Sequence, residues 1–199
     1  MIYALTRFNK KWLFASLVIF ISFQISVLHR DVQALSQHQI IFFSLRKNYA
    51  AGFIKERSAF LITDLKKDDK NYQFYVQPAL DQAQILNVNF LSLNRDTVTR
   101  EIIIRDHQVV FQGYKMLFID QRLNYKELQI DGEFSALWLH QNTRFNLNKR
   151  PSRLKFKSII IDATNKDYQT EKFVAFAKNI HLNAHILKKN KAYLVQLTP

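Results

Sequence analysis

Histidine and carboxylate side chains are the residues of this chain that could support metal-dependent hydrolysis. A two-metal hydrolase needs several such ligands converging on metal ions that lie about 3.5–4 Å apart. The sequence has no HxH and no HxHxDH motif, so it offers no source for a conventional two-metal centre. The chain has six histidines: His29, His38, His107, His140, His181 and His185.

Two of these histidines, His181 and His185, are four residues apart. On a helix this spacing could place both imidazoles on one face and bind a metal. The pair falls at the end of a predicted helix, however, and it has no carboxylate partner. Helix-end capping or chance spacing is therefore the favoured interpretation.

Two aspartates, Asp64 and Asp162, each follow directly after an apolar segment that reads as a strand. Strand ends are where α/β folds place their sites, so both carboxylates are candidate site residues. Without histidine partners, a role in the turn that begins the next segment is favoured.

A basic segment is the strongest binding signal in the sequence. Within it, cations at Arg153, Lys155 and Lys157 alternate with Leu154 and Phe156. In a strand, this alternation would direct three cations to one face, where they could contact successive phosphates of a nucleic acid without sequence preference. The alternative is an edge strand protected by lysines against aggregation. The candidate nucleic-acid contacts are Lys149, Arg150, Arg153, Lys155 and Lys157.

Composition restricts the function classes further. The net charge of +13 favours polyanionic partners, although a solubilising surface would have the same charge. Cysteine is absent, which excludes disulfides, Cys-based zinc sites and Cys nucleophiles. No nucleophile elbow is present, and the 3 glycines are too far apart to form a phosphate-binding loop. The 199 residues suffice for one domain and an anchor.

An apolar run near the N-terminus predicts a transmembrane helix over 12–29. The flank 1–11 carries Arg7, Lys10 and Lys11, so the positive-inside rule keeps it in the cytoplasm and exports the chain beyond the helix. We expect 30–39 to be a linker or the end of the helix, and 40–199 to be a single exported domain. A cleaved signal peptide or a buried helix of a soluble protein are the alternatives, but no small-x-small cleavage site follows the run.

The range 40–199 reads mostly as strands. One helical segment is predicted in its first half and one near its C-terminal end. Hairpins are predicted within 52–63, near Gln112-Gly113 and within 185–197. A helical spacing covers 72–86, limited by Pro78, and a second amphipathic helix covers 170–180. The continuous apolar run 157–161 predicts a buried parallel strand. The fold class is therefore α/β or α+β with mixed sheets.

The order of these segments resembles the C-terminal part of ComEC-type competence proteins, which are inner-membrane channels for DNA uptake. The resemblance rests on a last membrane helix followed by the strand-turn-strand block IIFFSLRKNYAAGFIKERSAFLITD, on Ile159–Asn165 and on Asn190–Val195. It implies a strand-rich, degenerate metallo-β-lactamase-like domain at the outer face of the inner membrane. It also implies DNA as a partner, together with the lipid bilayer and a separate multi-helix membrane channel subunit, because the family's other membrane helices are not in this chain.

One departure from that family matters most. Active metallo-β-lactamase-like domains carry HxHxDH after a core strand, whereas the corresponding range 137–144 retains only His140. The resemblance therefore makes Asp64, His140 and Asp162 vestigial site positions, with no metal or other cofactor expected. We expect a non-catalytic domain that assists DNA handling. The alternatives are a metal-dependent nuclease or hydrolase with an unconventional ligand set, and a structural envelope module that binds a protein.

Overall fold

The computed structural model describes residues 10–124, 128–188 and 190–197. They form two compact units, residues 1–37 and 38–199, which we describe separately. Residues 1–9 of the basic flank predicted over 1–11 lie outside the described residues.

The first unit is helix α2 (Lys10–Ser36), which is long and apolar enough to cross a membrane. At about 1.5 Å per residue its 27 residues extend about 40 Å. Because it lies near the N-terminus, a signal sequence would have the same length and composition. The range 30–39, expected as a linker or the helix end, is helical to Ser36 and enters the first strand at His38. No Gly or Pro interrupts this range, which is consistent with the longer helix.

The second unit contains a five-stranded sheet in the order β14-β1-β2-β3-β4. Its first four strands are antiparallel, and β4 is parallel to β3. The strands are β1 (His38–Phe42), β2 (Ala50–Lys55), β3 (Ser58–Thr63), β4 (Asn87–Leu91) and β14 (Tyr193–Gln196).

A seven-stranded sheet has the order β13-β12-β10-β8-β7-β6-β5. The four strands from β13 to β8 are parallel and the rest are antiparallel. The strands are β5 (Thr97–Val98), β6 (Ile102–Arg105), β7 (Gln108–Phe111), β8 (Tyr114–Ile119), β10 (Ala136–Leu139), β12 (Ser158–Ile161) and β13 (Asn183–Ile186). A separate parallel pair is formed by β9 (Gly132–Phe134) and β11 (Leu154–Phe156).

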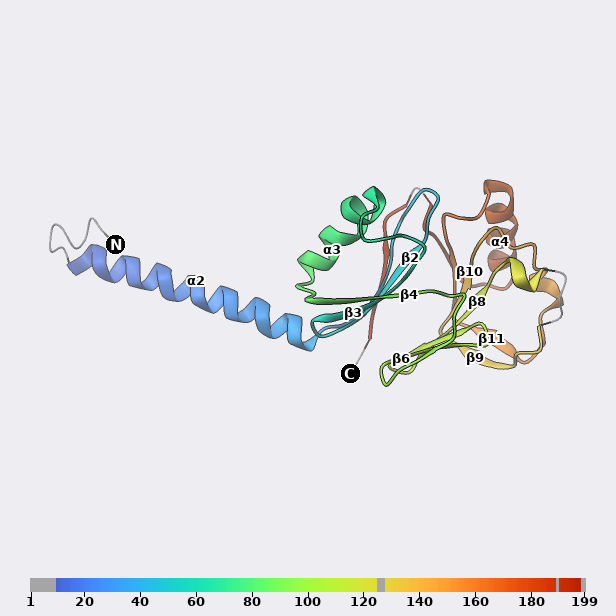
Figure 1. The fold of residues 1–199 in the computed structure, drawn as a ribbon, viewed down its shortest axis with the longest axis horizontal. Helices are drawn as coiled ribbons and strands as arrows, with labels where there is room; N and C mark the ends of the chain where they lie inside the picture. Colours follow the sequence, from blue (N-terminus) through green and yellow to red (C-terminus); the bar gives the residue numbers. More distant parts are fainter. Residues whose placement is uncertain (1–9, 125–127, 189, 198–199) are drawn as a thin grey trace. The chain divides into compact units, whose positions relative to one another are not determined.

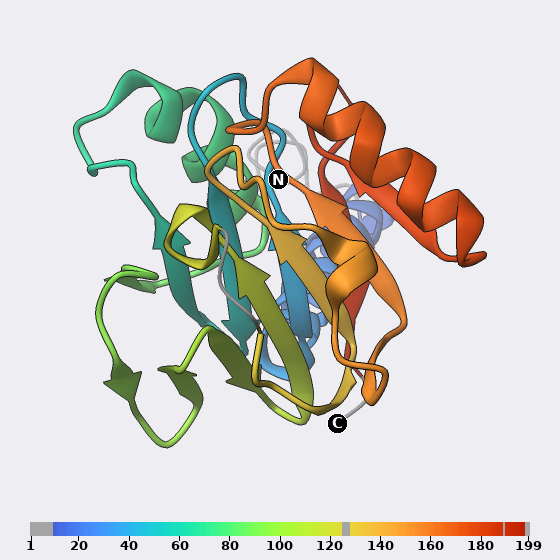
Figure 2. The same ribbon diagram turned by 90° about the vertical axis from the view of Figure 1, so that its right-hand side faces the viewer.

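Helices cover the outer faces of the two sheets (Figure 1). The π-helix η1 (Tyr72–Val76) and α3 (Gln77–Gln82) pack on the five-stranded sheet through Tyr72, Val76 and Leu80. Helix α4 (Asp167–Asn179) packs on the seven-stranded sheet, and Figure 2 views the domain from this side. Two short 3-10 helices, η2 (Gln121–Leu123) and η3 (Leu147–Lys149), lie in the loops that follow β8 and β10.

The core between the sheets accounts for the uninterrupted apolar strands. Ile160 of β12 packs into the layer shared by both sheets, whereas Ile159 and Ile161 pack beneath α4. The same layer holds Phe42 of β1 against Trp138 of β10, with ring centroids 5.8 Å apart. A strand buried on both faces has no polar side to display, so the alternation typical of a half-buried strand is lost.

Most predicted elements are confirmed. The hairpins within 52–63 and near Gln112-Gly113 are present, as are the parallel strand at 157–161 and the helix at 170–180. The mixed α/β class is confirmed as two mixed sheets with covering helices.

The hairpin predicted within 185–197 is wrong. Strand β13 pairs in parallel with β12, whereas β14 crosses to the other sheet and pairs antiparallel with β1. Each strand completes a different sheet edge, and local sequence carries no signal for such a long-range choice.

Pro78 limits the helix before it, as expected: η1 ends at Val76, and α3 begins at Gln77 with Pro78 in its first turn. The amide of Gln77 bonds to the carbonyl of Tyr72, a wide π turn directly before the proline. Wider turns of this kind accommodate a ring that lacks an N–H and crowds the preceding carbonyls.

Truncating Ile104, which is 1% exposed, should cost about 2–5 kcal/mol of unfolding free energy, because Ile104→Ala leaves a cavity between the sheets. Its neighbour Ile103 is 39% exposed, and Ile103→Ala should cost less than about 1 kcal/mol. Chemical denaturation of both variants in mild detergent measures the difference. Equal losses would contradict the assigned strand faces.

Candidate functional site

Three parallel strands, β8, β10 and β12, end at one edge of the seven-stranded sheet. Register pairs Ile119 with Leu139 and Leu139 with Ile161, so the residues that come directly after them meet side by side. These residues are Asp120, His140 and Asp162, with exposed fractions of 1%, 1% and 2%. We call this row of side chains the carboxyl edge.

Both oxygens of the buried Asp162 carboxylate accept hydrogen bonds. Oδ2 accepts from Trp138 Nε1 at 3.1 Å and lies 2.6 Å from His140 Nδ1. Oδ1 accepts from the amide and hydroxyl of Thr164 and from Asn165 Nδ2. A buried carboxylate needs such donors to offset its lost hydration, and this set ties β10, β12 and the loop before α4 together.

His140 is the centre of an aromatic group at this edge. The Tyr49 ring, from the loop before β2, lies edge-on at 4.2 Å between ring centroids. Burial, with the nearby Asp64 and Asp162 charges as further causes, raises the pKa of Tyr49 well above its ordinary value. Tyr49 therefore stays neutral, and it connects the five-stranded sheet to His140.

Asp120 has its own cationic partner. Arg122 donates from Nε to Oδ2 at 2.8 Å and from its backbone amide to Oδ1 at 2.9 Å. The guanidinium also donates to the carbonyl of Leu93 at 3.2 Å. This ion pair caps η2 and fixes the loop after β8.

Asp64 follows β3 of the five-stranded sheet and is therefore not part of the row at the ends of β8, β10 and β12. It is exposed, and it accepts from the amide of Tyr49 and from Asn48 Nδ2, each at 3.1 Å. Its contacts are those of a turn residue that orders the loop before β2.

The other candidate ligands are also dispersed. His181 follows the end of α4, whereas His185 lies in β13 and stacks on Tyr193 at 3.6 Å between ring centroids. They therefore do not share a helix face. Burial lowers the pKa of His185.

The basic segment forms part of a short edge strand. In β11 Leu154 and Phe156 are buried, whereas Arg153, Lys155 and Lys157 are exposed, as the alternation predicts. Lys155 pairs with Glu133 of β9 at 3.7 Å, which partly offsets the charge of this stripe. We call Arg153, Lys155 and Lys157 the β11 stripe.

The two remaining cations of the segment lie outside the strand. Lys149 ends η3 and is exposed. Arg150 is half-buried, with its guanidinium 5.1 Å from the centre of the Phe176 ring and 5.9 Å from that of Phe156. Arg150 thus packs between Phe156 of β11 and Phe176 of α4.

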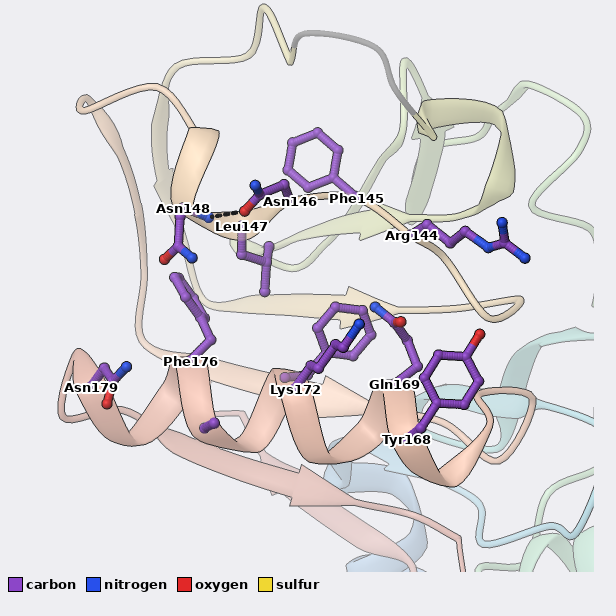
Figure 3. Close-up of a pocket in the computed structure, with 12 residues that line it drawn as sticks. Arg144, Phe145, Asn146, Leu147, Asn148, Tyr168, Gln169, Lys172, Phe176 and Asn179 are labelled. Atoms are coloured by element: carbon purple, nitrogen blue, oxygen red, sulfur yellow. Dashed lines mark hydrogen bonds between the residues drawn. The ribbon is translucent and has the colours of Figure 1, made fainter.

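A groove of about 730 Å³ lies between residues 144–148 and one face of α4 (Figure 3). Phe145, Phe173 and Phe176 contribute buried rings to it, and polar side chains surround them. It lies beside Arg150, next to the basic segment.

Comparison with known families decides the assignment. The family model of the ComEC C-terminal domain matches residues 40–197. The chain belongs to the ComEC C-terminal domain family. No curated protein matches it. The context of this ComEC domain is therefore that of a competence protein, and ComEC proteins are membrane proteins, in agreement with the apolar helix α2.

The carboxyl edge of this ComEC domain does not fit a metal ion. The Asp162 oxygens are taken by hydrogen bonds from five donor groups, and those of Asp120 by Arg122. Among residues 10–124, 128–188 and 190–197, no three His, Cys, Asp or Glu side chains are grouped so that they could hold a metal. The polar side chains at this edge form hydrogen bonds with one another and with Arg122, Trp138 and the loop after β12.

Sequence reasoning found Asp64, His140 and Asp162 but missed Asp120. Its signal was present, because Leu117-Phe-Ile-Asp120 has the same apolar-strand-to-aspartate form as the segments ending at Asp64 and Asp162. Trp138 and Tyr49 carried no such signal, since their contacts to the edge come from pairing across strands and across sheets.

The two strand-end aspartates should differ sharply in their contribution to stability. Asp162→Ala leaves the buried Trp138 Nε1 without its acceptor and removes the partner of His140 Nδ1, so it should cost about 3 kcal/mol or more. Asp64→Ala, at an exposed turn, should cost about 0.5–1.5 kcal/mol. Denaturation curves of the two variants test this order. A larger loss for Asp64→Ala would show that the carboxyl edge does not anchor the fold.

Proposed function

We propose that this chain is a membrane-anchored, non-catalytic domain of a DNA-uptake protein that contacts DNA at the outer face of the inner membrane. Family membership supports the DNA-uptake context. The observation that supports the DNA contact is the exposure of Lys155 in β11 and of Arg153 and Lys157 on either side of it, alternating with buried Leu154 and Phe156.

The fold assignment in this proposal is a degenerate metallo-β-lactamase-like domain. The order of layers supports it: a helix, a mixed sheet, a second mixed sheet and a helix. The position of Asp120, His140 and Asp162 at the ends of parallel strands supports it too, because this is where α/β folds place sites.

A non-catalytic role follows in our proposal from the hydrogen bonds of the carboxyl edge. Its two buried carboxylates are already bound by protein donors, and Arg122 already neutralises Asp120. Stoichiometric zinc or manganese in the purified chain, together with nuclease activity, would instead establish the metal-dependent alternative.

We further propose that a separate multi-helix membrane subunit forms the channel.

Neutralising the β11 stripe should weaken DNA binding and its dependence on salt. Replacing Arg153, Lys155 and Lys157 by Gln removes three phosphate contacts, so the slope of log affinity against log salt for duplex DNA should fall by roughly 2–3. Fluorescence anisotropy of a labelled duplex, titrated at several salt concentrations, measures this slope.

A charge-matched control is available in the loop before η1. Lys66, Lys67 and Lys70 are also exposed, and replacing them by Gln removes the same net charge elsewhere. Glu133→Gln should act in the opposite direction and strengthen binding, because Glu133 pairs with Lys155. Equal effects of the two triple variants would reduce the stripe to general surface charge. Absence of DNA binding at low salt would instead favour a structural envelope module that binds a protein.

Orientation in the membrane has its own prediction. A reporter that is active only outside the cytoplasm, fused after Pro199, should be active, because Arg7, Lys10 and Lys11 hold the N-terminal flank inside. Replacing these three cations by Glu should lower the reporter signal. An inactive reporter on the unmodified chain would overturn the proposed localisation.

A further inference from the structure

The groove beside α4 is lined by side-chain amides, whereas the β11 stripe consists of cations. One wall carries Asn146 and Asn148, and α4 contributes Gln169 and Asn179 from the other. Figure 3 shows Arg144 and Tyr168 at one end and Asn148 and Asn179 at the other, with Lys172 between them. Side-chain amides offer paired donors and acceptors, which suit the edges of a planar, polar ligand.

An exposed aromatic ring lies at one end of this groove. Tyr168 is 45% exposed, and the Nζ atom of Lys172 lies 5.7 Å from its ring centre. A partly exposed ring beside a cation provides a stacking surface for a nucleobase and a contact for its phosphate.

The charge of the groove suits an anionic ligand. Of the described residues that line it, the charged ones are Arg144 and Lys172, both cations. The acidic residues Asp167 and Glu171 of α4 are not among them, and Asp167 is paired with Lys188 at 2.7 Å.

One cation of the basic segment, Arg150, lies beside the groove. Phe176 lines the groove and lies under Arg150, and the same guanidinium lies over Phe156, between Lys155 and Lys157 in sequence. Arg150 therefore adds a third cation next to this groove.

We propose that this groove binds unpaired nucleotides of single-stranded DNA, with a base stacked on Tyr168 and its phosphate beside Lys172. This inference rests on the proposed function and assigns it a second site. The bases of a duplex are paired and stacked on one another, so they cannot use Tyr168 or the amides. The volume of about 730 Å³ falls within the usual range for small-ligand sites and accommodates one or a few nucleotides.

The test compares single-stranded with duplex DNA on the full chain in detergent micelles. The probes are a fluorescent oligothymidine and a duplex of matched phosphate number. Tyr168→Ala should weaken oligothymidine binding roughly 5- to 100-fold. Tyr168→Phe keeps the aromatic ring and should bind oligothymidine as tightly as the unmodified chain. Duplex affinity should change less than about twofold. Lys172→Gln should lower the salt slope for oligothymidine by about 0.7.

Tyr75→Ala is the matched control, because Tyr75 is 57% exposed on η1, on the other sheet's helix layer. It should leave both affinities unchanged, and thermal melting should show that all variants remain folded. Unchanged oligothymidine binding by Tyr168→Ala, or equal losses for both probes, overturns the groove assignment while the β11 stripe result still stands. Binding of neither probe by the unmodified chain overturns the proposed function itself.

Discussion

Burial of the Asp162 carboxylate is the constraint on which the rest of the domain depends. A carboxylate that is 2% exposed must be supplied with donors, and here they come from β10, from the loop after β12 and from His140. The loop that satisfies it leads directly into α4, so the same contacts set where that helix begins. His140 extends the connection to Tyr49 and the five-stranded sheet. The hydrogen bonds of one carboxylate thus connect the carboxyl edge to the loop that leads into α4, which forms one wall of the groove.

The carboxyl edge of this ComEC domain brings three buried polar residues together at the ends of parallel strands. Asp120, His140 and Asp162 stand at the ends of adjacent parallel strands, where ligands usually bind. Their polar atoms are instead directed to one another and to Arg122. These interactions join β10, β12 and the loops that follow β8 and β12. The exposed cations considered in our DNA-binding proposals lie elsewhere, at β11 and beside α4.

Sequence reasoning succeeded where the signal was local. The helix at 170–180 and the turns at Gln112-Gly113 and beyond Lys55 follow from periodicity and turn chemistry over a few residues. The continuous apolar run of β12 revealed its burial on both faces. The strand-end positions of Asp64 and Asp162 could be read in the same way.

The failures depended on partners distant in sequence. Strand β14 pairs with β1 at one edge of the five-stranded sheet, and Tyr49 contacts His140 across the two sheets. No local sequence pattern encodes either contact. The ion pair of Asp120 with Arg122 is local, but its importance comes from burial, which sequence alone did not reveal. The π turn before Pro78 shows that neighbouring backbone can adapt to a proline.

The pairing of the first strand with the last has a consequence for how the protein is made. Ile40 of β1 faces Val195 of β14, so this edge of the sheet stays unpaired until nearly the whole chain has been synthesised. Contacts between residues so distant in sequence form slowly, because the intervening chain must first be ordered. During that interval the outer edge of β1 is exposed to other chains. Completion of the C-terminal strand is thus the step that protects the newly made domain from aggregation.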